Sequence, residues 1–91
     1  MTELPLGEVF CTTEALWVFV ENLDEEPNTF LARHANGDWG EVNDHDRKAN
    51  EHTVKHGLRV LSVYSLRSGQ TILVVTEGDR SKTTILLPKE Y

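Results

Sequence analysis

The last third of the chain carries the pattern that most restricts the fold. From Leu58 to Leu66 the hydrophobic residues alternate with a period of two, as in a half-buried strand. Residues 67–70 read Arg-Ser-Gly-Gln, which is typical of a hairpin turn. Two further segments rich in Ile, Leu, Val and Thr, 71–76 and 82–87, favour strands. The pattern therefore predicts an antiparallel meander with short connections.

A short edge strand and a helix are expected near the start of the chain. Residues 1–6 should fray, because they offer little to bury, and 6–11 favour an edge strand. Thr12 and Thr13 provide hydroxyl groups for the N-cap of a helix. Helical spacing places five apolar residues on its buried face: Ala15, Leu16, Phe19, Val20 and Leu23.

Two more helices are predicted before the strands begin. The second should start at Pro27, which suits a first helical turn, and stop at Gly37. The third should start at Asn43 and run to about His56, with Gly57 as its stop. Its sequence is polar almost all round, so we expect it to lie on the surface.

Three polar or aromatic residues in this region have structural interpretations. Asp38 is expected to cap or brace its loop, and Trp39 to fill the core rather than to stack on a ligand. Asn50 lies within a predicted helix, although asparagine is a poor helix former. It should therefore face water, bond to another element, or serve a function.

These elements predict one α+β domain spanning residues 1–91. The expected architecture is a two-layer sandwich, with N-terminal helices packed on a C-terminal sheet of three to four antiparallel strands. The sheet residues expected to be buried are Val60, Leu73, Val75 and Leu86, with Phe30 and Trp39 against them.

Composition excludes several classes of protein. Ninety-one residues are too few for two cores or for an enzyme with a separate cofactor domain. The longest apolar run, 15–20, is far too short for a bilayer span, and no signal peptide is evident. A single cysteine, Cys11, cannot form an internal disulfide, which fits a reducing compartment. We therefore expect a soluble cytoplasmic protein without a membrane association.

The net charge of −6 is unevenly distributed. Residues 1–30 contain seven acidic residues and no Lys or Arg. Such a surface repels phosphate backbones, so direct nucleic-acid binding through this third is not expected. It favours a protein partner with a basic surface, unless the acids only aid solubility. The candidate partner-binding residues are Glu21, Asp24, Glu25 and Glu26.

The polar turn at 76–81 carries an alternative, catalytic hypothesis. A carboxylate near an arginine beside an antiparallel sheet is similar to the arrangement in barnase-like and RelE-like ribonucleases. Glu77 would act as a base, Arg80 or Arg59 would bind the phosphate, Thr83 would orient it, and His34 would act as an acid. A self-bonded structural turn is the simpler interpretation, and the negative net charge argues against a free ribonuclease.

No metal or cofactor is predicted. His52 and His56 are four residues apart and share a helix face, with His45 nearby. A zinc site needs three or four converging ligands, and Cys11 is the only thiol. Two histidines on a polar surface helix are the simpler interpretation.

Several segments of the chain resemble a family of small bacterial proteins encoded on plasmids and integrated elements. The similar segments are 33–40, 61–64 and 76–88, together with Asp46, Asn50 and the terminal Glu90-Tyr91. The resemblance covers roughly residues 5–91. It implies a bacterial mobile element and a cytosolic location. It implies no established activity, and His45, His52 and His56 lie outside its pattern.

The charge pattern and the resemblance together favour a small acidic binding protein without enzymatic activity. Its expected role is to inhibit or modulate a host nucleic-acid-handling or defence complex. The alternative is the small ribonuclease or toxin that would use the turn between Glu77 and Arg80.

Overall fold

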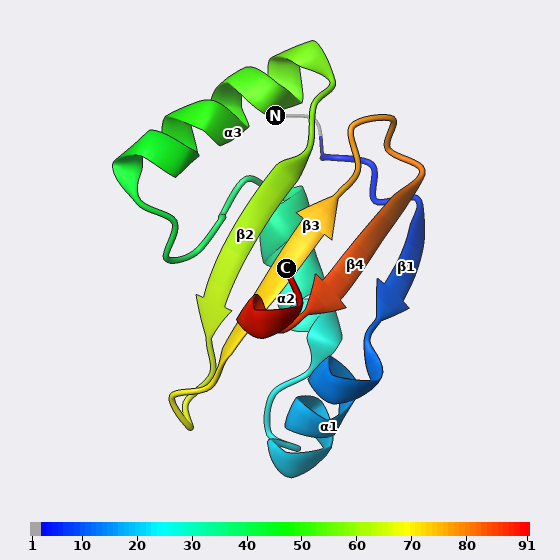
Figure 1. Ribbon diagram of the computed structural model, residues 1–91, viewed down its shortest axis with the longest axis vertical. Helices are drawn as coiled ribbons and strands as arrows, with labels where there is room; N and C mark the ends of the chain where they lie inside the picture. The colour runs from blue at the N-terminus through cyan, green and yellow to red at the C-terminus, as the bar shows by residue number, and fades with distance from the viewer. Residues whose placement is uncertain (1–2) are drawn as a thin grey trace.

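The computed structural model describes the backbone of residues 3–91 and the side chains of these residues except 54 and 55. Helices precede a C-terminal run of strands, which confirms the predicted α+β class (Figure 1). The elements are β1 (Glu8–Cys11), α1 (Thr13–Glu21), α2 (Pro27–Ala35), α3 (Asp44–His56), β2 (Val60–Ser65), β3 (Thr71–Thr76), β4 (Lys82–Leu86) and the short 3-10 helix η1 (Pro88–Glu90).

The sheet has the strand order β1-β4-β3-β2. As predicted, β2, β3 and β4 form an antiparallel meander. The edge strand β1 pairs in parallel with β4, so the sheet is mixed rather than purely antiparallel. Gly7 permits this pairing: it has a φ of +65°, and a Cβ there would lie 2.5 Å from the carbonyl oxygen of Arg80.

Helix α2 lies against one face of the sheet and η1 over the other, and α1 lies at the lower end of the sheet, beyond the end of β1 (Figure 1). Phe30 on α2 joins the two layers, because its ring centroid lies 6.0 Å from that of Phe19 and 5.3 Å from that of Tyr64. The residues that β2, β3 and β4 turn toward the helices are all buried: Val60, Ser62, Tyr64, Ile72, Val74, Thr76, Thr83 and Ile85.

The predicted core is correct in part. Val60, Leu73 and Val75 are buried, whereas Leu86 is only half-buried. Because side chains alternate along a strand, Leu73 and Val75 point away from Phe30 rather than against it.

Trp39 was expected in the core, but it is half-buried and lies outside the core cluster. Its carbonyl accepts a hydrogen bond from the N–H of Val63 at 3.0 Å, so its segment runs along the edge of β2. The Trp39 side chain lines a hollow together with Val42 and Arg47, and its Nε1 is buried without a hydrogen-bond partner among the described residues.

The predicted buried face of α1 is correct in part. Ala15 and Phe19 are buried as predicted, together with Val18, whereas Leu16, Val20 and Leu23 are exposed. The helix is apolar almost all round, so spacing alone did not show which stripe faces the core.

The predicted fraying of residues 1–6 is also wrong for the part that the structure describes. Leu4 is buried, and its N–H donates to the carbonyl of Ala35 at 2.9 Å. Leu6 packs against the core, and its carbonyl accepts a hydrogen bond from Thr83. Apolar residues at positions 4 and 6 thus hold the start of the chain against α2 and β4.

The predicted helix boundaries are confirmed by their capping bonds. The Thr12 hydroxyl accepts from the N–H of Ala15 at 3.1 Å, and the Asn43 side chain accepts from the N–H of Asp46 at 2.8 Å. Gly57 ends α3 in the left-handed conformation, with a φ of 71°. None of the helices in the described part of the chain is long and apolar enough to cross a membrane.

Candidate functional site

His34 and Thr83, two of the residues in the ribonuclease hypothesis, lie together beneath the sheet. The His34 side chain is fully buried, with Nδ1 2.5 Å from the Ser62 hydroxyl and Nε2 2.8 Å from that of Thr76. The Thr76 hydroxyl lies 2.7 Å from that of Thr83, which in turn donates to the carbonyl of Leu6 at 2.8 Å. Together these groups form a continuous buried hydrogen-bond chain from β2 across the sheet toward β1.

The buried chain keeps His34 uncharged. Burial lowers the pKa of His34 to about 4, and the positive charge of Arg80 adds to the effect. At neutral pH one ring nitrogen is therefore a donor and the other an acceptor, which matches two hydroxyl partners. The imidazole is thus neutral and enclosed, and its two ring nitrogens face hydroxyl groups rather than solvent.

Glu77 lies on the opposite face of the sheet from His34. It lines a hollow of about 340 Å³ beneath the C-terminal turn, together with Val75 and Leu86. Its carboxylate lies 3.4 Å from the guanidinium of Arg59. The sheet therefore separates the proposed base from the proposed acid.

Arg80 contacts backbone carbonyl groups rather than acidic side chains. Its guanidinium donates to the carbonyls of Leu58 at 2.6 Å, Glu77 at 3.2 Å and Thr53 at 3.3 Å. These bonds tie the end of α3 to the turn before β4. His34 and Thr83 thus lie beneath the sheet, whereas Glu77 lies on its other face, so the structure does not bring all the residues of the ribonuclease hypothesis to one open site.

The four candidate partner-binding acids fall into two pairs. Asp24 accepts from the Arg67 guanidinium at 2.9 Å, and Glu25 accepts from the Arg67 backbone N–H at 3.0 Å. These two acids therefore hold the β2–β3 hairpin against the loop after α1. Glu21 and Glu26 are exposed and form no ion pair with any side chain that the structure describes.

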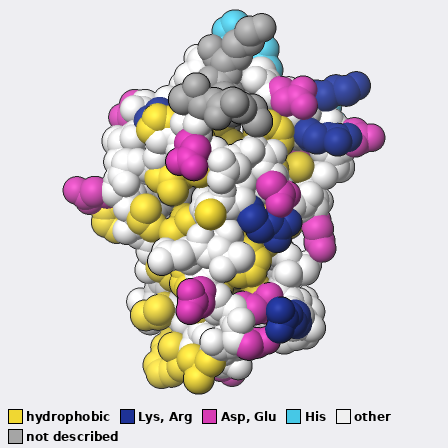
Figure 2. Space-filling view, turned by 180° about the vertical axis from the view of Figure 1, so that it is seen from behind, with side chains coloured by type: hydrophobic (Ala, Val, Ile, Leu, Met, Phe, Trp, Pro, Cys, Tyr) yellow, Lys and Arg dark blue, Asp and Glu magenta, His cyan; other side chains and the backbone are white. Residues whose placement is uncertain are grey.

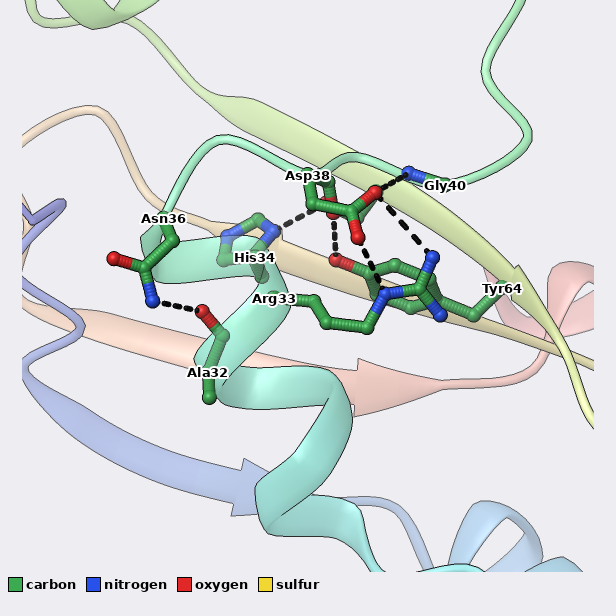
Figure 3. A network of polar contacts seen from close by, with 8 residues as sticks. Ala32, Arg33, His34, Asn36, Asp38, Gly40 and Tyr64 are labelled. Carbon is green, nitrogen blue, oxygen red and sulfur yellow. Dashed lines mark hydrogen bonds and ion pairs between the residues drawn. The ribbon is translucent and has the colours of Figure 1, made fainter.

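Asp38 braces its loop, as predicted (Figure 3). Its carboxylate accepts from Arg33 Nε at 2.6 Å, and its carbonyl accepts from the Tyr64 hydroxyl at 2.6 Å. The Arg33 guanidinium also lies 4.6 Å from the centroid of the Tyr64 ring. The bond from Arg33 lowers the pKa of Asp38, and burial raises the pKa of Tyr64 to about 12. These bonds tie the loop to Arg33 on α2 and to Tyr64 on β2.

Asn50 bonds across to a strand, which confirms one of its predicted alternatives. Its side-chain amide donates to the carbonyl of Leu61 at 2.6 Å and accepts from the N–H of Leu61 at 3.2 Å. The N–H of Glu41 donates to the carbonyl of Val63 at 2.7 Å on the same edge of β2. Asn50 and the segment 39–41 therefore close this edge of the sheet.

The most prominent exposed feature is apolar, and the sequence interpretation missed it. Trp17 is 61% exposed, and four side chains form what we call the α1 surface: Leu16, Trp17, Val20 and Leu23. Figure 2 shows hydrophobic side chains gathered at the lower end of the molecule, where α1 lies. The sequence does contain an indication of this surface: the segment that forms α1 has more large apolar residues than one buried stripe of a helix can hold.

Two further candidate groups show no arrangement for chemistry. Burial raises the pKa of the Cys11 thiol, with the charge of Glu90 adding to the effect, so the thiol is not activated as a nucleophile. The rings of His52 and His56 stack with centroids 4.1 Å apart. Within the described part of the chain, no three His, Cys, Asp or Glu side chains converge on one point.

No family model, curated protein or solved structure matches this chain. The resemblance to small plasmid-encoded proteins therefore stays a prediction.

Proposed function

We propose that this protein binds another protein through the α1 surface and catalyses no reaction. The observation that carries the proposal is the exposure of Leu16, Trp17, Val20 and Leu23 on one helix and the turn after it. Monomeric proteins rarely expose large contiguous apolar patches unless they bind a partner there. Tryptophan is also among the residues that contribute most to binding at interfaces.

The charge around this surface supports a basic partner. Residues 1–30 carry seven acidic groups and no Lys or Arg, and Glu21 lies at the end of α1 itself. Lys or Arg at the rim of the partner's site would be attracted to these acids, which speeds association. A nucleic-acid backbone would be repelled. A partner protein that presents an apolar patch surrounded by basic side chains would complement both the α1 surface and the acidic residues around it.

A finer proposal concerns the identity of that partner. Proteins that handle nucleic acids present basic surfaces, and the resemblance points to a bacterial mobile element and a cytoplasmic location. We therefore propose that the partner belongs to a host nucleic-acid-handling or defence complex, which this protein inhibits or modulates.

A matched pair of leucine substitutions tests the α1 surface. Leu16 on α1 is 52% exposed, and Leu58, which lies two residues before β2, is 53% exposed. The immobilised protein would first be used to purify its partner from a bacterial lysate. Calorimetry should then show that Leu16→Ser weakens affinity about tenfold or more, since a buried leucine contributes roughly 1.5–3 kcal/mol.

Leu58→Ser is the control and should change affinity by less than about twofold. Both variants should retain the wild-type thermal midpoint, because both side chains are exposed. Equal loss of affinity in the two variants, or no loss in either, would contradict a role for the α1 surface.

A second pair of variants tests the charge. Glu21→Lys should slow association several-fold at low salt, with a smaller effect as salt is raised, because screening shortens the reach of surface charges. Glu51→Lys, an exposed reversal on α3, is the control. Association rates measured by surface plasmon resonance at two salt concentrations distinguish them. An identical effect of both reversals would show that only the total charge of the protein affects association.

Asp24 and Glu25 are not suitable positions for this charge-reversal test. Both side chains bond to Arg67, so their reversal would also disturb the contact with the hairpin.

A further inference from the structure

The two edge strands of the sheet, β1 and β2, differ in whether other segments of the chain bond to their outer edges. On the β2 edge, Leu61 bonds to the Asn50 amide and Val63 bonds to the segment 39–41. On the other side of the sheet, β1 is the last strand, and no described segment pairs with its outer edge. The β2 edge is therefore covered at Leu61 and Val63, whereas no described segment covers β1.

The pairing of β1 with β4 shows which backbone groups are open. The N–H of Glu8 donates to Ser81 and that of Thr12 to Ile85, at 3.1 and 3.0 Å. Successive residues of a strand direct their backbone groups to opposite edges. The N–H and carbonyl groups of Val9 and Cys11 thus point outward, ready for an added strand.

The side chains along this edge give it little protection beyond Glu8. Natural edge strands are commonly protected by a very short length, charged side chains, proline or a bulge. The sequence of β1 is Glu-Val-Phe-Cys, and the Val9 and Phe10 side chains are 47% and 46% exposed on its two faces. Thr12 connects β1 directly to α1, so this edge and the α1 surface are contiguous along the chain.

We propose that the partner adds an extended segment to the outer edge of β1, with alternating apolar and Lys or Arg side chains. This inference rests on the proposed function and specifies how the partner binds. Main-chain bonds to Val9 and Cys11 supply affinity, and the alternate side chains supply specificity. Charge selects this occupant over a second copy of the chain, because each copy carries −6 and would place Glu8 in the shared edge.

The test uses a defined probe, a seven-residue peptide of alternating lysine and valine with both ends blocked. Bound to the ¹⁵N-labelled protein, it should slow amide hydrogen exchange of Val9 and Cys11 at least tenfold. A peptide with glutamate in place of lysine should not bind. Chemical-shift changes of the α1 backbone amides report separately on peptide contact with the α1 surface.

Two variants at one position separate the backbone contribution from that of the side chain. Val9→Pro removes an outward-facing N–H. An edge strand tolerates proline at such a position, so the variant should fold and should bind the peptide about tenfold more weakly. Val9→Thr keeps that N–H and should weaken it less than threefold. If Val9→Pro does not fold, exchange at Cys11 in the wild-type protein still decides the question.

Three results would overturn the inference. Peptide binding that shifts α1 amides without slowing exchange at Val9 and Cys11 would leave the proposed function intact and exclude strand addition. No binding at millimolar peptide would exclude this class of segment. Slow exchange at these amides without peptide, increasing with protein concentration, would assign the edge to a second copy.

Discussion

Lowering the pH from 7 to 4 should remove about 3 kcal/mol from the free energy of unfolding through His34 alone. The pKa of His34 is about 4 in the folded protein, against an ordinary value of 6.5. Below pH 6.5 the unfolded chain therefore binds a proton that the folded protein excludes. The stabilisation is complete above pH 6.5 and is lost as the pH falls toward 4. Urea unfolding at pH 7, 5.5 and 4 measures this loss.

His34→Gln is the matched control for this prediction. Glutamine offers a donor and an acceptor to Ser62 and Thr76 but does not titrate. The variant is expected to be less stable at pH 7, with a shallower dependence on pH between 7 and 4. Carboxylates with lowered pKa values, such as Asp38, contribute equally to both proteins. The same dependence in both proteins would contradict a neutral buried His34.

Gly40→Ala should cost about 3–4 kcal/mol of stability, or prevent folding. Gly40 has a φ of +71°, and a Cβ there would overlap the carbonyl oxygen of Val63 and lie 2.6 Å from the Tyr64 ring. The overlap would push the segment 39–41 away from the edge of β2. Chemical denaturation of the purified variant measures the cost.

Gly69→Ala separates this overlap from the cost of the backbone conformation. Gly69 has a φ of +93°, and a Cβ there would meet no described atom within 4 Å. This variant should lose only about 1–2 kcal/mol, the cost of a left-handed residue with a side chain. Equal losses at the two positions would show that the approach of Gly40 to β2 does not matter.

Local features of the fold were predictable because they depend on residues close together in the sequence. The caps at Thr12 and Asn43 and the left-handed stop at Gly57 are each formed within one helical turn. The hairpin at 67–70 joins strands that are also adjacent in the chain. The period of two along β2 was also visible in the sequence, and Val60 is buried as predicted, because it lies on the face that meets the helices.

The candidate site was less predictable, because residue type does not show which neighbours a side chain will meet. Arg80 and Glu77 are three residues apart, yet the Arg80 guanidinium bonds to backbone carbonyls, and the Glu77 carboxylate meets Arg59. Four acids between 21 and 26 looked alike, yet Arg67 from the hairpin engages two of them. In each case a residue far along the chain decides the role.

The α+β class, the order of the elements, the antiparallel meander and the acidic character of residues 1–30 were all evident from the amino-acid sequence. These follow from short-range periodicity, turn residues and charge, which need no knowledge of distant contacts. The parallel pairing of β1, the enclosure of His34 and the exposure of Leu16 and Trp17 depend on contacts between distant parts of the chain and became visible in the folded structure. Leu16 and Trp17 stay exposed because α1 carries more apolar side chains than the core of the domain can bury. Which part stays exposed depends on how β1 and β4, more than seventy residues apart in sequence, come together.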